Sequence, residues 1–214
     1  LTGPSASGKT TSAHKVAEAL EASGTPAHVI SLDNFFKGAQ YYPRLPDGTL
    51  DYENPDTLDM PLIRQCLSEL STTGKTVLPI YDFATESRSS ETEALDLEGG
   101  VCIVEGIHAL NPVITDSLPS ENLMKLYVSV SSRIADEDGD VLMSKRDLRF
   151  IRRLVRDYYH RASSVERTYD LWGSVQRGED KYIFPYSHLA AEKIDSLHAL
   201  SLIHISEPTR LQLI

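Results

Sequence analysis

"LTGPSASGKTT" (residues 1–11) is the most informative stretch of the chain, because its glycines, lysine and threonine fit the spacing G-x-x-x-x-G-K-[ST]. Small residues allow successive backbone N–H groups to turn inward around phosphate oxygens, and the helix that follows adds its positive N-terminal end. In such a loop the lysine reaches the outer phosphates and the threonine hydroxyl binds Mg²⁺. The alternative is a Ser/Gly-rich turn that matches the spacing by chance. We interpret the stretch as a nucleotide-binding loop with these candidate contacts: Gly3, Ser5, Ala6, Ser7, Gly8, Lys9, Thr10 and Thr11.

The segments on either side of the loop bear on this interpretation. A helix is expected after it, with Val16, Ala17, Ala19 and Leu20 as apolar positions. The strand that should precede the loop is cut off at Leu1, and the chain has no initiator Met, so we expect a missing segment upstream.

The composition is that of an ordinary globular domain. The 214 residues suit one domain with a sizeable core, with 41% hydrophobic and 24% charged residues. The net charge of −10 argues against general nucleic-acid binding, so an anionic substrate must be held by local positive charge. Cys66 and Cys102 lie in separate apolar stretches, which favours buried thiols in a reducing, cytoplasmic setting. No apolar run reaches transmembrane length and no signal peptide is seen, so no membrane partner is expected.

The end of the chain differs in character from the rest. Residues 200–210 (LSLIHISEPTR) resemble the in-frame translation of a sequencing-library adaptor. A natural final strand is the alternative, since Leu202, Ile203 and Ile205 could pack. We expect one domain over residues 1–199 and exclude residues 200–214 from functional reasoning as an adaptor-derived tail.

Apolar runs alternate with helical patterns, which predicts an α/β fold with a parallel sheet flanked by helices on both faces. Four buried strands are expected, at 27–33, 101–106, 125–130 and 191–197. The first two end in the carboxylates Asp33 and Glu105. Because ligands in open α/β sheets bind beyond the carboxyl ends of strands, both residues are candidates for the site.

The region between the first two expected strands follows a different pattern. Residues 43–61 are rich in turn formers, residues 62–70 (LIRQCLSEL) predict a helix, and residues 76–83 (TVLPIYDF) predict a short strand. We interpret this region as a small inserted lobe that binds the acceptor.

An arginine stripe marks one further element. Arg149, Arg152, Arg153 and Arg156 occupy positions i, i+3, i+4 and i+7, which lie on one face of a helix. A charge stripe is usually a solvated face. Solvated faces normally mix Lys and Glu, whereas this stripe consists of arginine, whose planar and permanently charged group suits phosphate oxygens. We therefore expect an Arg-rich lid helix that faces phosphate groups.

Several stretches, taken together and in order, resemble the uridine kinase and phosphoribulokinase family. They are GPSASGKTT (3–11), SLDNFF (31–36), DYENPDT (51–57), PIYDFATESR (79–88), VCIVEGIHAL (101–110) and DLRFIRRLVRD (147–157). The likeness covers nearly all of residues 1–185, and LWGSVQRGEDKYIFPY (171–186) is similar to a bacterial branch of uridine kinase-like nucleoside kinases.

The resemblance implies a P-loop NTPase fold and transfer of the γ-phosphoryl group of ATP, with Mg²⁺, to a sugar hydroxyl. It implies that Asp33 is the general base for that hydroxyl and that Glu105 lies near the metal, together with Thr10. Taken alone, Asp33 would be interpreted as a turn or cap residue. The stripe corresponds to the family's lid, which closes over both substrates and excludes water. This places Lys9, Arg152 and Arg156 in catalytic roles and Arg149, Arg152 and Arg153 against the substrates.

Acceptor recognition is where the chain departs from the family pattern. Tyr81 and Phe83 match aromatic residues that pack on the nucleoside, although in isolation they would be assigned to a core strand. Glu53 replaces an Asp that binds sugar hydroxyls and keeps the carboxylate. Glu86 stands where pyrimidine-specific members carry a base-reading His, and Arg167 where they carry a Gln.

Two consequences of the Glu86 and Arg167 replacements are open at this stage. The base preference changes, because a site built to hydrogen-bond one base edge rejects others. Alternatively, the two charges pair with each other and leave the site open to other acceptors.

The expected function is therefore a nucleoside 5′-hydroxyl kinase with a uridine- or cytidine-like acceptor. One alternative is a kinase for a sugar phosphate or a pantothenate-like acceptor, and Glu86 argues against a phosphorylated acceptor. The other is a non-catalytic nucleotide-binding regulatory module, against which the presence of Lys9, Thr10, Asp33 and Glu105 speaks. Members of the family that the chain resembles often form dimers or tetramers, so a homo-oligomer is a further expectation.

Overall fold

A parallel sheet forms the centre of the computed structural model, which describes residues 1–197 except 84, 117 and 162. Strand β1 (Ala27–Ser31) pairs in parallel with β4 (Val101–Glu105), and β5 (Leu126–Ser129) pairs in parallel with β8 (Glu192–Asp195). Leu1 and Thr2 join the two pairs. The backbone of Leu1 bonds to Val104 and Gly106 beside β4, and the backbone of Thr2 bonds to Leu126 and Val128 of β5. The order across the sheet is therefore β1, β4, residues 1–2, β5 and β8.

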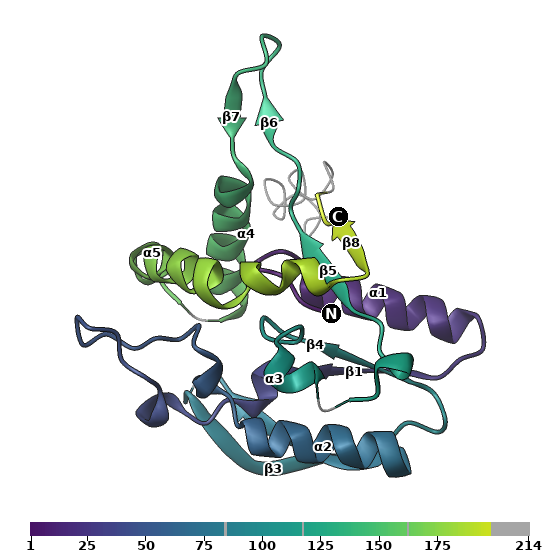
Figure 1. The fold of residues 1–214 in the computed structure, drawn as a ribbon. Helices are drawn as coiled ribbons and strands as arrows, with labels where there is room; N and C mark the ends of the chain where they lie inside the picture. Colours follow the sequence, from purple (N-terminus) through teal and green to yellow (C-terminus); the bar gives the residue numbers. More distant parts are fainter. Residues whose placement is uncertain (84, 117, 162, 198–214) are drawn as a thin grey trace, which may run out of the picture.

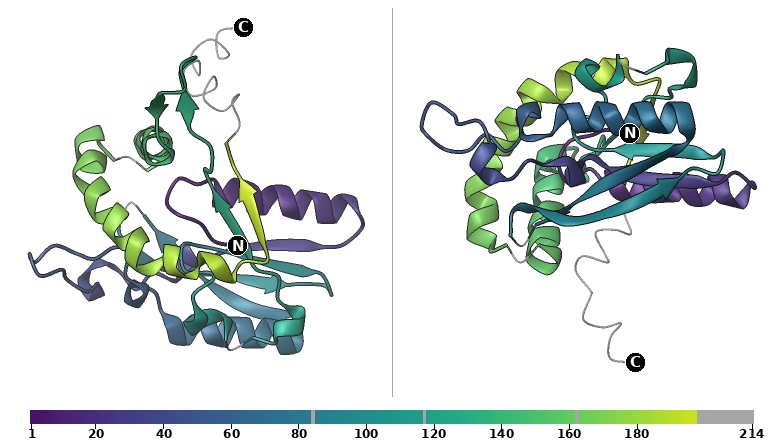
Figure 2. Two further views of the ribbon diagram at one scale, coloured as in Figure 1. Left: turned by 45° about the horizontal axis from the view of Figure 1, so that its top comes forward. Right: turned by 90° about the horizontal axis from the view of Figure 1, so that it is seen from below.

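The two faces of this sheet carry different layers, as Figure 1 shows. Side chains alternate along a strand, so Ile103 of β4 faces α1 (Lys9–Ala22), while Ile30 of β1 packs on the opposite side. That opposite side is covered by α2 (Met60–Thr73) and by the antiparallel hairpin of β2 (Lys75–Asp82) and β3 (Ser87–Asp96). The right-hand view of Figure 2, from below, shows α2 and this hairpin together in front of the sheet.

The inserted region between β1 and α2 consists mainly of turns. Its short 3₁₀ segments are η1 (Leu32–Phe35), η2 (Ala39–Tyr41) and η3 (Pro55–Thr57). Beyond β4 come α3 (Pro112–Thr115) and η4 (Ser120–Asn122). Residues of η1, of the hairpin β2–β3 and of α5 (Val165–Tyr182) line a common cavity.

Two long helices, α4 (Lys145–His160) and α5, lie next to each other (Figure 1). In that view they are at the left of the molecule, and α1 is at the right. Ser144 begins α4 with a capping box, in which its hydroxyl and the Asp147 carboxylate exchange hydrogen bonds with backbone N–H groups. The small hairpin of β6 (Ile134–Ala135) and β7 (Val141–Met143) precedes α4 and projects from the body. The 3₁₀ segment η5 (Phe184–Leu189) leads from α5 to β8.

The structure confirms the α/β fold, the four parallel strands, the helix over residues 62–70 and the helix that carries the arginine stripe. One boundary was wrong: β1 ends at Ser31, so Asp33 lies in η1 and not in the strand. Strand β3 and the hairpin β6–β7 were not predicted, because β3 is mostly polar and exposed and β6 and β7 are very short. The tail at 200–214 lies outside the described residues, and the domain limits of 1–199 stay a prediction. Within the described part of the chain, no helix is long and apolar enough to cross a membrane.

Candidate active site

The loop of residues 3–8 has a backbone that its sequence permits. Gly8 precedes α1 with φ at +88°, in the left-handed region that glycine adopts without strain. A side chain at Gly3 would collide with the carbonyl oxygen of Val128, so the loop can pass β5 closely only at a glycine. The loop therefore leads directly into the positive N-terminal end of α1, where a phosphate group is favoured.

Lys9 and Thr10 lie at the start of α1 and point to different partners. The Lys9 ammonium donates to the Pro4 carbonyl over 3.3 Å, and burial lowers the pKa of Lys9 while the nearby Glu105 carboxylate opposes that shift. The Thr10 hydroxyl donates to Glu105 over 3.0 Å, and the Ser31 hydroxyl donates to the same oxygen over 2.9 Å. A hydroxyl and a buried carboxylate are thus side by side at the carboxyl ends of β1 and β4.

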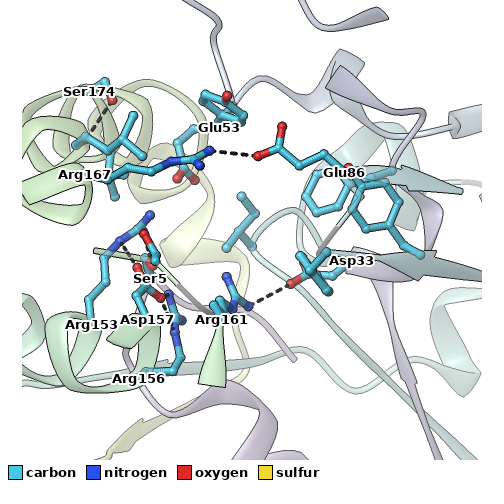
Figure 3. A pocket seen from close by; sticks show the side chains of 18 of the residues that line it. Ser5, Asp33, Glu53, Glu86, Arg153, Arg156, Asp157, Arg161, Arg167 and Ser174 are labelled. Carbon is cyan, nitrogen blue, oxygen red and sulfur yellow. Dashed lines mark hydrogen bonds and ion pairs between the residues drawn. The ribbon is translucent and has the colours of Figure 1, made fainter. Parts of the chain in front are cut away.

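A cavity of about 370 Å³ opens beside the loop, between the pair α4–α5 and the inserted lobe. Figure 3 shows charged side chains reaching into it from several elements. Its lining includes the predicted site residues Ser5, Lys9, Asp33, Glu53, Tyr81, Phe83, Glu86, Arg153, Arg156 and Arg167. Residues that are distant in the sequence therefore meet at one place.

Asp33 faces this cavity from η1 and is approached by an arginine that the sequence analysis missed. The guanidinium of Arg161, which follows α4, lies 3.8 Å from the Asp33 carboxylate and stacks over the Phe83 ring at 4.9 Å. Desolvation lowers the pKa of Arg161, although the group remains a cation at neutral pH. Arg161 lies one position beyond the next helical repeat after Arg156, so the periodicity of the stripe did not include it.

Glu53 is the most isolated acid of the cavity. Its side chain is 8% exposed, and its Oε2 atom has no hydrogen-bond partner among the described residues. Burial raises the pKa of Glu53 to about 7, and the nearby Arg153 guanidinium partly offsets this effect. An unsatisfied carboxylate in a cavity is suited to accept hydrogen bonds from a hydroxyl-bearing ligand.

Aromatic rings form one wall of the cavity. Phe36 and Tyr81 pack edge to face with centroids 5.5 Å apart, and Tyr81 and Phe83 do so at 5.2 Å. The hydroxyl groups of Tyr42 and Tyr81 are 3.4 Å apart, and burial raises the pKa of both phenols. Sequence reasoning identified Tyr81 and Phe83 but missed Phe36, Tyr42 and Tyr52. Their aromatic type was the available signal, since Phe36 lies in the stretch 31–36 and Tyr42 and Tyr52 lie next to and within the turn-rich residues 43–61.

Glu86 and Arg167 form an ion pair across the rim of the cavity. Arg167 of α5 donates to Glu86, in the β2–β3 turn, over 2.8 Å, and both side chains are at least two-fifths exposed. Of the two alternatives left open by the sequence, the structure contains the pairing of the two charges (Figure 3). Because neither group is buried, either residue can exchange its partner for a ligand, and this exchange costs little free energy.

The arginine stripe divides among three environments. Arg153 donates to the Ser5 hydroxyl over 2.7 Å, and Arg153 and Arg156 both pair with Asp157 at the edge of the cavity. Arg152 instead lines a second cavity.

Arg149 corrects the expectation of one phosphate-facing stripe. It is 3% exposed, does not line the cavity, and forms a bidentate pair with Glu179.

The second cavity, of about 440 Å³, lies on the other side of the loop and of α1's first turns. Thr11, Ser12 and Lys15 of α1 line it, together with Arg152 and the segment 194–196 at the end of β8. The Ser196 hydroxyl donates to the Ser7 carbonyl and ties this segment to the loop. Sequence reasoning missed residues 194–196 as site residues, although they form the carboxyl end of β8 and the position after it.

Comparison with known proteins assigns this arrangement to a family. The model of the Phosphoribulokinase / Uridine kinase family matches residues 1–199. The chain belongs to this family. Its relatives include the uridine kinase of Lactobacillus helveticus, which is 30% identical over 89% of this chain and 82% of its own. The uridine kinase of Deinococcus deserti is 31% identical over 78% of this chain and 70% of its own.

A solved structure supports the fold although its sequence is only distantly similar. The phosphoribulokinase of Rhodobacter spheroides superposes with a TM-score of 0.58 at 15% identity, over 88% of this chain and 66% of that one. This likeness shows that the two proteins share the same fold.

Proposed function

We propose that this kinase-family protein transfers the γ-phosphoryl group of ATP to the 5′-hydroxyl of a nucleoside, with a uridine- or cytidine-like acceptor. The observation that carries the proposal is the single cavity in which Ser5 and Lys9 of the loop face Asp33, Glu53 and an aromatic wall. Membership of the family and the relatives that are named uridine kinase support it.

ATP would bind across the loop. The loop N–H groups and Lys9 hold the phosphates, and the second cavity beside Gly8 accepts the adenosine part. Thr10 and Glu105 fit Mg²⁺, because this ion takes one or two protein oxygens and fills its remaining positions with phosphate oxygens and water. When bound, the ion neutralises charge on the transferring phosphoryl group.

Asp33 would serve as general base for the transfer. The acceptor oxygen forms a bond to the γ-phosphorus while the bond from that phosphorus to the bridging oxygen of ADP breaks, and the hydroxyl proton passes to Asp33. Arg153 and Arg156, held by Asp157, lie at the same cavity and stabilise the spread negative charge. Arg152, on the side of the second cavity, would do so from the ATP side.

The acceptor would lie with its sugar at Glu53 and its base between the aromatic rings. Glu86 and Arg167 then face the edge of the base with one acceptor group and one donor group. Kinases for phosphorylated acceptors are less well supported, because Arg161 and Arg167 of the lining are already matched by the acids Asp33 and Glu86. A regulatory module without transfer activity would have no use for a base beside the loop.

The test is an ADP-release assay with ATP and Mg²⁺ against uridine, cytidine, adenosine, guanosine and no acceptor. We expect turnover above the control with a pyrimidine nucleoside, and none with 5′-deoxyuridine, which lacks the reacting hydroxyl. ATP binding without acceptor-dependent ADP release for any nucleoside would contradict the proposal.

A further inference from the structure

A buried ion pair that the proposed transfer does not use connects the two long helices behind the loop. Arg149 of α4 donates to both carboxylate oxygens of Glu179 of α5, over 2.6 and 2.7 Å. The two side chains are 3% and 0% exposed. A bidentate pair of this kind has a defined geometry, since two parallel hydrogen bonds fix the orientation of both groups.

The same pair also holds the backbone of the phosphate loop. The Ser5 N–H donates to Glu179 over 2.9 Å, and the Ser5 carbonyl accepts from Arg149 over 3.0 Å. Arg153 donates to the Ser5 hydroxyl over 2.7 Å. The N–H, carbonyl and hydroxyl groups of Ser5 are therefore all bound by α4 and α5.

Stability alone is a weak explanation for this arrangement. Moving two charges out of water is unfavourable, and buried ion pairs can often be replaced by apolar residues without loss of stability. The loop, however, has a conformation that needs support: Ala6, next to Ser5, has φ at +57°, which side-chain-bearing residues rarely adopt. Hydrogen bonds to both the N–H and the carbonyl of Ser5 restrain the backbone that leads into Ala6.

We propose that Arg149 and Glu179 are positioning residues that hold the loop in its phosphate-binding conformation. The inference rests on the proposed function only in that the loop binds ATP, not in the identity of the acceptor. It also gives Arg149 a role that differs from the substrate contact expected from the stripe. The pair acts through Ser5 and does not touch the substrate itself.

The test compares two double variants that each remove one ion pair between α4 and α5. Arg149→Met/Glu179→Met removes the buried pair. Arg146→Met/Asp180→Met removes the neighbouring pair, which is also 2.6 Å long but exposed at 45% and 53% and does not contact the loop. The readouts are the equilibrium Kd of a fluorescent ATP analogue with Mg²⁺ and the Tm of each protein.

We expect the first variant to bind the analogue roughly tenfold or more weakly, because two loop hydrogen bonds are lost, while its Tm stays near that of the wild type. The control variant should match the wild type in both readouts. Wild-type affinity in a folded Arg149→Met/Glu179→Met protein would overturn the proposal, as would an equal loss in the control.

A second variant covers the case in which the first fails to fold. Arg149→Lys keeps the charge but cannot form the bidentate pair and the Ser5 contact together. We expect weaker ATP binding at nearly unchanged Tm, and unchanged binding would overturn the proposal. Because the readout is ATP binding, absence of nucleoside kinase activity would contradict the proposed function and leave this result interpretable.

Discussion

Glu53 shows how burial sets the behaviour of a single residue. Its pKa is raised from an ordinary 4.5 to about 7, so the carboxyl is protonated in the folded protein at pH 5 to 6 and ionised above pH 7. A group with a raised acid pKa favours the folded state at low pH. That contribution is lost as the pH rises from 4.5 to 7, and it amounts to roughly 3 kcal/mol.

We predict a pH-dependent acceptor affinity from this residue. The ionised carboxylate accepts hydrogen bonds from sugar hydroxyls better than the protonated form, so the KM for the nucleoside should fall as the pH rises through 7. In Glu53→Gln the KM should be higher and nearly independent of pH between 6 and 8. Steady-state kinetics with saturating ATP measure this, and an identical pH profile in the variant would show that Glu53 does not contact the acceptor.

Glu86 and Arg167 give a prediction about base preference. Glu86→His/Arg167→Gln restores the residue types that pyrimidine-specific members are expected to carry. We predict that kcat/KM for uridine rises roughly tenfold or more relative to adenosine and guanosine, because the donors and acceptors then match the base edge. Competition assays with mixed nucleosides measure the ratio. An unchanged ratio would mean that the pair lies outside the base subsite.

Among the helices, α4 depends on its N-cap residue, Ser144, which lies just before its first turn. The Ser144 hydroxyl accepts from the Asp147 N–H, and the Asp147 carboxylate accepts from the Ser144 N–H. The side chain of Ser144, and then its backbone N–H, lower the pKa of Asp147. Ser144→Ala should lower the free energy of unfolding by about 1 kcal/mol, measured by urea denaturation. Ser90→Ala, in exposed β3, is the control and should leave stability within about 0.5 kcal/mol.

Elements whose sequence has a clear residue periodicity were predictable, and strands that depend on backbone pairing with a neighbouring strand were not. The arginine spacing gave α4, and the apolar runs gave β1, β4, β5 and β8. Strand β3 escaped because its sequence, SRSSETEALD, has almost no apolar residue and is held by backbone pairing with β2. The stripe itself was expected to share one role, but α5 contributes Glu179, which draws Arg149 into the interior. No pattern within α4 contains that information.

The whole molecule places two cavities on opposite sides of one loop. Ser5 and Lys9 line the first, and Gly8 and Thr11 line the second. Most residues that line the first cavity lie in the motifs that carry the family resemblance. The second cavity depends on the contact between Ser196, at the end of β8, and the loop, which only the folded chain brings together.

This arrangement predicts that one ligand can fill both cavities. A compound that joins adenosine and uridine through their 5′-oxygens by a polyphosphate chain should raise the Tm more than ATP or uridine alone at equal ligand concentration, because it binds with a lower Kd. Saturation at about 100 times Kd adds roughly 2.7 kcal/mol of stability, so a tighter ligand gives a visible further shift. A Tm no higher than with ATP would indicate that the cavities are not joined across the loop.

The role of Asp33 as general base is tested most simply by two measurements on Asp33→Asn: the rate of single-turnover transfer and the Kd for ATP. Asp56→Asn, an exposed carboxylate of η3, is the matched control. We predict that Asp33→Asn slows transfer by roughly 10²–10⁴-fold while ATP affinity stays close to wild type, because only the proton acceptor is lost. Wild-type transfer, or a parallel loss of ATP binding and turnover, would contradict the role of Asp33 as base.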